Sequence, residues 1–312
     1  MTSNCEKPVL ALGPMLFHWQ GADWRDFYFR LADEAPVDEV YLGETVCSKR
    51  QPFIEPHIAE VAERLQGSGK RVILSSLTLV TLERERRSVR ELAAQDDLLV
   101  EANDLSALQA LAGRPHAVGP MINVYNGPTA ALLARQGATV ICLPPELPAS
   151  SIAQIARSAP GPAYEVLAFG RVPLAISARC AHARAKGLAK DNCQFVCSQD
   201  PDGLAVSTLK GQPFLAMNGV QTVSFTCQAL LGELSTLAAG GVSRFRLSPQ
   251  RCDMAAVARL YRDVLDGALD PAEASDRLRA LAPDLPLSNG FLHGAPGAQW
   301  IADGRRRLAA HE

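Results

Sequence analysis

Three of the eight cysteines in this 312-residue chain lie close together in one stretch. Twelve residues separate Cys180 from Cys193, and three separate Cys193 from Cys197. A fourth cysteine, Cys47, lies far upstream in the segment YLGETVCSKR. Four thiolates can hold an iron–sulfur cluster or form a closed structural zinc site. We therefore predict that Cys47, Cys180, Cys193 and Cys197 bind one metal centre.

The spacing of these cysteines leaves both kinds of centre open. A Cys-x₃-Cys pair is acceptable for zinc, although two Cys-x₂-Cys pairs would favour zinc more clearly. The wide and irregular spacing suits a cluster held between separated segments. Basic residues flank the four cysteines, and we expect them to lower the thiol pKa values, although most should be solvated loop charges. They are Lys49, Arg50, Arg179, Arg184, Lys186 and Lys190.

The other four cysteines lack the spacing or the position that we expect of metal ligands. Cys142 falls within an apolar run and is expected to be a small core residue. Cys227 and Cys252 follow predicted strands, but neither has a partner at ligand spacing. Cys5 belongs to an end of the chain that we expect to be flexible. These four cysteines are therefore left out of the predicted metal centre.

Composition and charge narrow the class of protein. Hydrophobic residues make up 47% and charged residues 21%, which is typical of a soluble globular protein. The formal charge of −2 argues against a broad basic face for nucleic acid. The apolar run at residues 9–17 is too short to cross a membrane and lacks a basic leader. We predict a cytoplasmic protein, where cysteines serve metal binding or catalysis more often than disulfides.

The fold is predicted from the alternation of short apolar runs with longer, Ala-rich polar stretches. Continuous apolar strands followed by helices indicate a parallel sheet that is covered on both faces. Eight such units favour a (β/α)₈ TIM-like barrel over an open sheet. The predicted strands are residues 9–17, 39–43, 71–77, 97–101, 117–125, 139–143, 165–169 and 243–247, and the predicted helices are residues 23–35, 56–67, 83–95, 105–112, 128–136, 152–158 and 254–266.

The regular alternation fails between the seventh and eighth predicted strands. The cysteine loop at residues 178–200 is followed by apparent antiparallel strands at residues 202–226, with a turn at Asn218–Gly219. We interpret this region as an insertion of a cysteine loop and a β-hairpin into a single barrel domain, residues 1–281. Residues 282–312 are rich in Gly, Pro and Arg and form a predicted C-terminal tail.

The barrel topology agrees with the predicted metal centre. Cys47 follows the second predicted strand and Cys180 follows the seventh. Loops that follow the strands of a barrel emerge on one face, which carries the active site. Other polar residues near strand ends share this face. They are Glu44, Thr78, Glu101, Asn103, Asn123, Asn126 and Arg171.

Glu44 and Arg171 are the candidate substrate-binding residues, because each lies a few residues from a proposed ligand. A guanidinium can clamp a carboxylate in two-point geometry. An equally good interpretation is that Arg171 pairs with a neighbouring carboxylate or with a carbonyl of the cysteine loop. For the asparagines, capping or closing a loop is the expected role.

Motifs for other chemistries are missing from the sequence. It contains no GxSxG and no HExxH, and its six histidines form no spaced pair, so a peptidase is not supported. His182 lies in the cysteine loop and is expected to be exposed to solvent. There is also no P-loop or GxGxxG for a nucleotide cofactor. No catalytic residue is identified.

Three segments carry a resemblance to a known family: YLGETVCSKR, FGRVPLAISARC and DNCQFVC. They resemble the UbiV-like iron–sulfur proteins of ubiquinone biosynthesis, which belong to the collagenase-like family of so-called peptidases. The resemblance extends through most of the chain, including NGVQTVSF at residues 218–225. It implies a 4Fe–4S cluster held by Cys47, Cys180, Cys193 and Cys197. The tail from residue 282 matches nothing in the family pattern.

The resemblance also implies a function. UbiV-like proteins form a heterodimer with a homologous UbiU-like subunit and support oxygen-independent hydroxylation of a prenylated phenol or quinone precursor. A UbiT-like, sterol-carrier-like accessory protein assists them. Related proteins hydroxylate RNA with prephenate as the oxygen source, so prephenate is a candidate oxygen donor here. Two alternatives stay open: a prephenate-dependent enzyme of RNA hydroxylation, and a zinc-stabilised scaffold without enzymatic activity.

Overall fold

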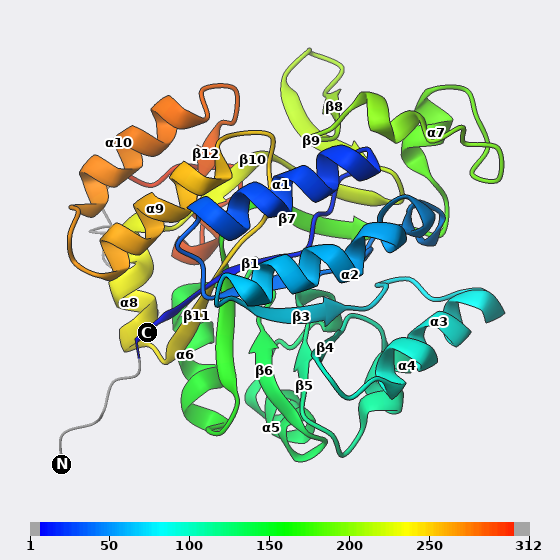
Figure 1. The fold of residues 1–312 in the computed structure, drawn as a ribbon. Helices are drawn as coiled ribbons and strands as arrows, with labels where there is room; N and C mark the ends of the chain where they lie inside the picture. Colours follow the sequence, from blue (N-terminus) through cyan, green and yellow to red (C-terminus); the bar gives the residue numbers. More distant parts are fainter. Residues whose placement is uncertain (1–6, 303–312) are drawn as a thin grey trace.

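Eight parallel strands close into a barrel in the computed structural model, which describes residues 7–302 (Figure 1). Each strand pairs in parallel with the next, and β11 pairs with both β7 and β1. The predicted (β/α)₈ barrel is therefore confirmed. The barrel strands are β1 (Val9–Leu12), β2 (Glu39–Leu42), β3 (Arg71–Ser75), β4 (Leu99–Ala102), β5 (His116–Val118), β6 (Ala138–Cys142), β7 (Ala163–Ile176) and β11 (Val242–Leu247).

Helices connect the strands and cover the outside of the barrel (Figure 1). Local sequence fixes where they start: Asn126 accepts a hydrogen bond from the backbone N–H of Thr129 at 2.9 Å and caps α5. The helices of this layer are α1 (Gly21–Glu34), α2 (Gln51–Gly67), α3 (Glu83–Ala94), α4 (Leu105–Leu111), α5 (Gly127–Arg135), α6 (Ala149–Ser158), α8 (Leu234–Ala239), α9 (Met254–Leu265) and α10 (Pro271–Leu281).

Several element boundaries differ from those predicted. β5 ends at Val118, not at residue 125, because Pro120 has no N–H for a sheet and Asn123 adopts a left-handed backbone with φ of 62°. α2 starts at Gln51, so Pro52 is its N-terminal proline and Pro56 lies inside the helix. α10 was not predicted from the sequence.

β7 is much longer than the predicted strand at residues 165–169, and it links the barrel to a second group of strands. Beyond Phe169 it pairs with β10 (Gln221–Ala229) in antiparallel orientation. β9 (Pro213–Asn218) and β8 (Leu204–Ser207) extend this antiparallel sheet outward. The short helix α7 (Ala181–Ala185) stands between β7 and β8 in the sequence, and Figure 1 shows it beside them.

The predicted C-terminal tail is described as far as residue 302. Within it, β12 (Leu287–Ser288) pairs with β10, and Leu285 and Leu292 are buried against the core. Residues 303–312 lie outside the described part of the chain, and the division into a barrel domain and a tail stays a prediction. Among the helices of residues 7–302, none is long and apolar enough to cross a bilayer.

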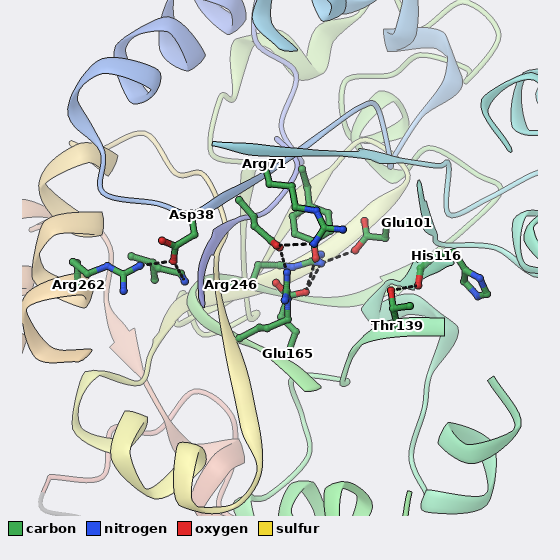
Figure 2. A network of polar contacts seen from close by, with 12 residues as sticks. Asp38, Arg71, Glu101, His116, Thr139, Glu165, Arg246 and Arg262 are labelled. Atoms are coloured by element: carbon green, nitrogen blue, oxygen red, sulfur yellow. Dashed lines mark hydrogen bonds and ion pairs between the residues drawn. The ribbon is translucent and has the colours of Figure 1, made fainter. Parts of the chain in front are cut away.

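A cluster of buried charges occupies the interior of the barrel (Figure 2). Arg246 Nη2 lies 2.6 Å from Glu101 Oε1 and 2.7 Å from Glu165 Oε2. The guanidinium lies 4.0 Å from the centre of the Tyr41 ring, and the Tyr41 hydroxyl donates to Glu165 at 3.0 Å. Because these groups come from β2, β4, β7 and β11, they tie opposite sides of the barrel together.

Two candidate pockets at one end of the barrel

The four predicted ligand cysteines line a single pocket, which we call the cysteine pocket. Cys47 lies between β2 and the 3₁₀ turn η1 (Ser48–Arg50), and Cys180 directly precedes α7. Cys193 and Cys197 come from the loop that follows α7, where Cys197 belongs to the 3₁₀ turn η3 (Val196–Gln199). The other residues lining the pocket are Lys49, Arg50, His182, Ala183, Lys190, Phe195, Val196 and Gly219.

Backbone hydrogen bonds shape the two cysteine-bearing loops. Glu44 Oε1 accepts from the N–H groups of Val46 at 2.8 Å and Cys47 at 3.0 Å, so this buried carboxylate holds the turn that carries Cys47. Lys49 Nζ donates to the carbonyl of Lys190 at 2.7 Å and to that of Asp191 at 3.0 Å. The loop after β2 is thereby tied to the cysteine loop.

The segment between Cys193 and Cys197 has an unusual backbone. Gln194 and Phe195 adopt positive φ angles of 49° and 52°. Two successive non-glycine residues in the left-handed region are costly and occur where the surrounding structure requires them. This turn allows Cys193 and Cys197 to line the same pocket although three residues separate them.

Arg50 is buried in the wall of the cysteine pocket, with 1% of its surface exposed. Nη1 donates to the carbonyl of Leu16 and Nη2 to Oδ1 of Asn218, both at 2.9 Å. The expectation that the flanking basic residues are mostly loop charges therefore fails for Arg50. Gly219 makes room for this guanidinium, because a Cβ there would lie 2.5 Å from Nη2.

The thiol pKa values differ from the prediction. Burial raises the pKa of the Cys47 and Cys197 thiols, and the nearby charge of Arg50 opposes this rise without cancelling it. The basic Arg50 does lower the thiol pKa values as expected, but the net pKa of these two cysteines is raised, because burial has the larger effect. The reason is desolvation, which disfavours an isolated thiolate more than one guanidinium favours it.

The chemistry of the pocket fits an anionic metal–thiolate centre. Four thiolates around a cluster carry net negative charge, which cations and N–H donors stabilise. Within residues 7–302, Arg50 Nε and His182 Nδ1 are buried without a hydrogen-bond partner, and both residues line the pocket. His182 was predicted to be exposed; it is instead fully buried, with Nε2 2.9 Å from Asp200 Oδ2.

In the described part of the chain, no group of three or more His, Cys, Asp or Glu side chains could hold a metal ion. A tetrahedral zinc ion with bonds of about 2.3 Å needs its sulfurs roughly 4 Å apart. An iron–sulfur cluster places a core of iron and sulfide between the cysteine thiolates, so their sulfurs lie farther apart than around a zinc ion.

A second pocket, the mouth pocket, opens at the carboxyl ends of the barrel strands. All eight barrel strands contribute to its lining. Seven do so near their carboxyl ends or through the loops that follow them, whereas the long β7 contributes Leu167, Arg171 and Pro173 from within the strand, and Gln221 comes from β10. This is the position of active sites in such barrels. The lining residues are Gly13, Pro14, Leu16, Thr45, Thr78, Glu101, Asn103, Pro120, Met121, Cys142, Pro145, Leu167, Arg171, Pro173, Gln221, Arg246 and Ser248.

Four polar groups of the mouth pocket are buried and lack a hydrogen-bond partner within residues 7–302. They are Thr45 Oγ1, Arg171 Nε, Arg246 Nε and Ser248 Oγ. A buried polar group without a partner costs about 1–3 kcal/mol, so such groups rarely gather without a reason. Two guanidinium N–H groups and two hydroxyls form a donor set suited to a ligand with carboxylate oxygens.

The two predicted substrate-binding residues have different positions. Arg171 lines the mouth pocket, where Nη1 donates to the carbonyls of Ser224, at 2.9 Å, and Phe225. These carbonyls belong to β10 and not to the cysteine loop. Glu44 does not appear in the lining of the mouth pocket and instead holds the Cys47 turn, as described above.

The other residues predicted near strand ends also separate into two groups. Thr78, Glu101 and Asn103 line the mouth pocket. Asn126 caps α5 and Asn123 ends a 3₁₀ turn, as expected for loop asparagines. Cys142, expected in the core, is fully buried at the end of β6 and lines the mouth pocket, where burial raises the pKa of its thiol.

The sequence analysis missed Thr45, Arg246 and Ser248, and it treated Arg50 only as a flanking loop charge and Asn218 only as a turn residue. A signal existed for Arg246, because the strand VSRFRL alternates arginine with apolar residues in a barrel whose strands are mainly apolar. Nothing in the local sequence distinguishes Arg50 from a solvated loop charge.

The fold and the two pockets define a TIM-barrel protein with a polar mouth pocket and a separate cluster of cysteines. The chain belongs to Peptidase family U32, whose model matches residues 28–302. Among solved structures, a protein described as of the dihydrodipicolinate synthase family from Coccidioides immitis is similar, at a TM-score of 0.40 and 11% sequence identity. That match covers 90% of this chain and 80% of the other chain.

Proposed function

We propose that this chain is a UbiV-like protein, the 4Fe–4S subunit of an oxygen-independent hydroxylase in ubiquinone biosynthesis. The observation that carries the proposal is the lining of the cysteine pocket: Cys47 and the three cysteines of the loop at residues 178–200 face one cavity. The buried Arg50 adds positive charge, and its Nε–H adds a donor, both of which stabilise an anionic cluster.

Each part of the cysteine pocket has a role in this proposal. When bound, the cluster supplies one-electron chemistry. The four thiolates hold it, and Arg50 compensates part of their charge from within the protein. Glu44 fixes the turn of Cys47, and Lys49 closes the loop at residues 190–191 over that turn.

The mouth pocket is proposed to bind the oxygen donor, with prephenate as the candidate. Arg171 and Arg246 each offer a buried Nε–H, while Thr45 and Ser248 each offer a buried hydroxyl. Carboxylates of the donor would satisfy these groups. The prenylated phenol or quinone precursor would then be hydroxylated by the assembled complex, not by this chain alone.

The proposed partners are a UbiU-like homologous subunit and a UbiT-like accessory protein, in the reducing cytoplasm. Large apolar side chains are exposed on the strands that extend beyond the barrel: Leu174, Leu209 at the β8–β9 turn, and Phe214 are 41%, 108% and 60% exposed. Exposed apolar groups of this kind are common at interfaces between proteins. They support association through this sheet.

Anaerobic co-purification with the UbiU-like subunit tests the proposal. We expect about four irons and four sulfides on this chain, and hydroxylation of a prenylated phenol that depends on prephenate and not on oxygen. Stoichiometric zinc on a colourless protein would instead support the scaffold. Retention on tRNA or ribosomal RNA at moderate salt, with prephenate-dependent modification of the RNA, would support the alternative of RNA hydroxylation.

A further inference from the structure

We propose that Arg50 sets the reduction potential of the cysteine-pocket centre, raising it through a fixed buried charge and through an N–H bond from Nε to a cluster or thiolate sulfur. This inference rests on the proposed function, because it requires a cluster in the pocket. It assigns Arg50 as a positioning and tuning residue that does not ligate iron.

One nitrogen of the Arg50 guanidinium, in the wall of the pocket, has no hydrogen-bond partner in the described residues. Nη1 and Nη2 are occupied by the Leu16 carbonyl and by Asn218 Oδ1. Nε is buried without a partner in the described residues. Arg50 lines the same pocket as Cys47 and Cys197, which come from the two cysteine-bearing loops.

Electrostatics gives the direction of the effect. Reduction transfers one electron from a low-potential one-electron reductant to the centre, which thereby gains one negative charge. A fixed cation stabilises the more negative form, and so does a hydrogen bond to sulfur; both raise the potential. Salt screens a charge that is 1% exposed far less than it screens a surface charge.

The surroundings hold Arg50 rigidly in this position. Asn218 accepts from Nη2 and donates through Nδ2 to the Leu16 carbonyl at 2.7 Å and to Gln221 Oε1 at 3.1 Å. The turn Asn218–Gly219 was interpreted from the sequence as a hairpin turn. In the structure it also supplies the amide that orients the guanidinium and the glycine that leaves space for it.

The test is an anaerobic redox titration of the reconstituted protein, monitored by electron paramagnetic resonance, with iron content measured in parallel. Arg50→Gln should shift the potential to a more negative value at unchanged iron content. Arg50→Lys keeps the charge and should lie closer to the wild type. The matched control is Arg179→Gln, which removes an exposed arginine next to Cys180 and should leave the potential unchanged.

An Arg50→Gln variant that holds its cluster at the wild-type potential would overturn the inference. If this variant does not assemble a cluster, Asn218→Asp replaces it: a carboxylate beside the guanidinium should also make the potential more negative, and a wild-type value there would overturn the inference. A wild-type protein without a cluster would overturn the proposed function itself, so the two failures are distinct.

Discussion

The two pockets are neighbours, yet they are built in different ways. The mouth pocket takes its residues from the ends of regular parallel strands, and the charge of Arg246 is balanced by Glu101 and Glu165 inside the barrel. The cysteine pocket is made from irregular loops, with consecutive positive φ angles near Cys197. Asn218 and Gln221 connect the two by a hydrogen bond.

The difference shows how one scaffold can separate two tasks. Strand ends hold polar groups at fixed positions, which suits the recognition of a small ligand. Loops can bend around a bulky metal centre, but they need added support, which Glu44, Lys49 and Arg50 provide through buried and partly buried hydrogen bonds. Changes in one pocket should therefore leave the other largely intact.

The largest effect is expected from removing a ligand in the cysteine pocket. Cys180→Ser or Cys197→Ser should lower the iron content from about four per chain to a small residue, while binding of prephenate at the mouth pocket persists. Iron analysis and the visible spectrum after anaerobic reconstitution measure the loss of iron. Cys252→Ser, outside both pockets, is the matched control, and equal losses there would contradict the assignment.

Removing Arg246 from the buried charges inside the barrel should lower the stability of the fold more than it affects the iron–sulfur centre. Arg246→Met leaves Glu101 and Glu165 buried without their common cation, which should lower the free energy of unfolding by about 3–5 kcal/mol. Urea unfolding followed by circular dichroism measures this. The control Arg64→Met removes an exposed pair with Asp33 and should cost less than about 1 kcal/mol.

Acid should lower the stability of the folded protein through His18, which lies beside the cysteine pocket. Burial and the charge of Arg50 lower the pKa of this imidazole to about 4, so it is neutral in the folded protein at pH values where the unfolded chain binds a proton. Stability should fall as the pH drops from about 6.5 towards 4, by about 3 kcal/mol from this group.

The variant His18→Phe tests this, because it keeps an aromatic ring against Phe53 and Phe195 but removes the titration. The difference in unfolding free energy between wild type and variant should change across this pH range. A constant difference for His18→Phe would contradict the prediction.

The smallest expected effect concerns the mouth pocket. Arg171→Gln removes one charged donor and should weaken prephenate binding about tenfold to a hundredfold, since a hydrogen bond to a charged group contributes about 1.5–3 kcal/mol. Calorimetric titration measures the affinity, and Arg179→Gln is the exposed control. The iron content of the Arg171→Gln variant should stay at the wild-type level. An unchanged affinity for prephenate in the folded variant would show that Arg171 does not belong to the ligand site.

The barrel followed from the sequence alone, and so did the four cysteines that line one pocket, whose role as metal ligands stays a prediction. Strand–helix alternation is a local pattern, and closing eight such units places every following loop on one face. Cys47 and Cys180 therefore reach the same end whatever the details of packing. Strand lengths were less well determined, because the extension of β7 past Phe169 depends on pairing with β10, far along the chain.

Which charges are buried became clear only from the packing of distant parts of the chain. Arg50 looks like a loop charge beside a cysteine until Asn218, 168 residues away, is seen to hold it. Arg246 meets Glu101 across 145 residues and Glu165 across 81. Burial of a charge depends on partners that local sequence does not specify, since the cost of desolvation is met by groups from distant strands. The cysteines were visible in the sequence; the cation that accompanies them was visible only in the fold.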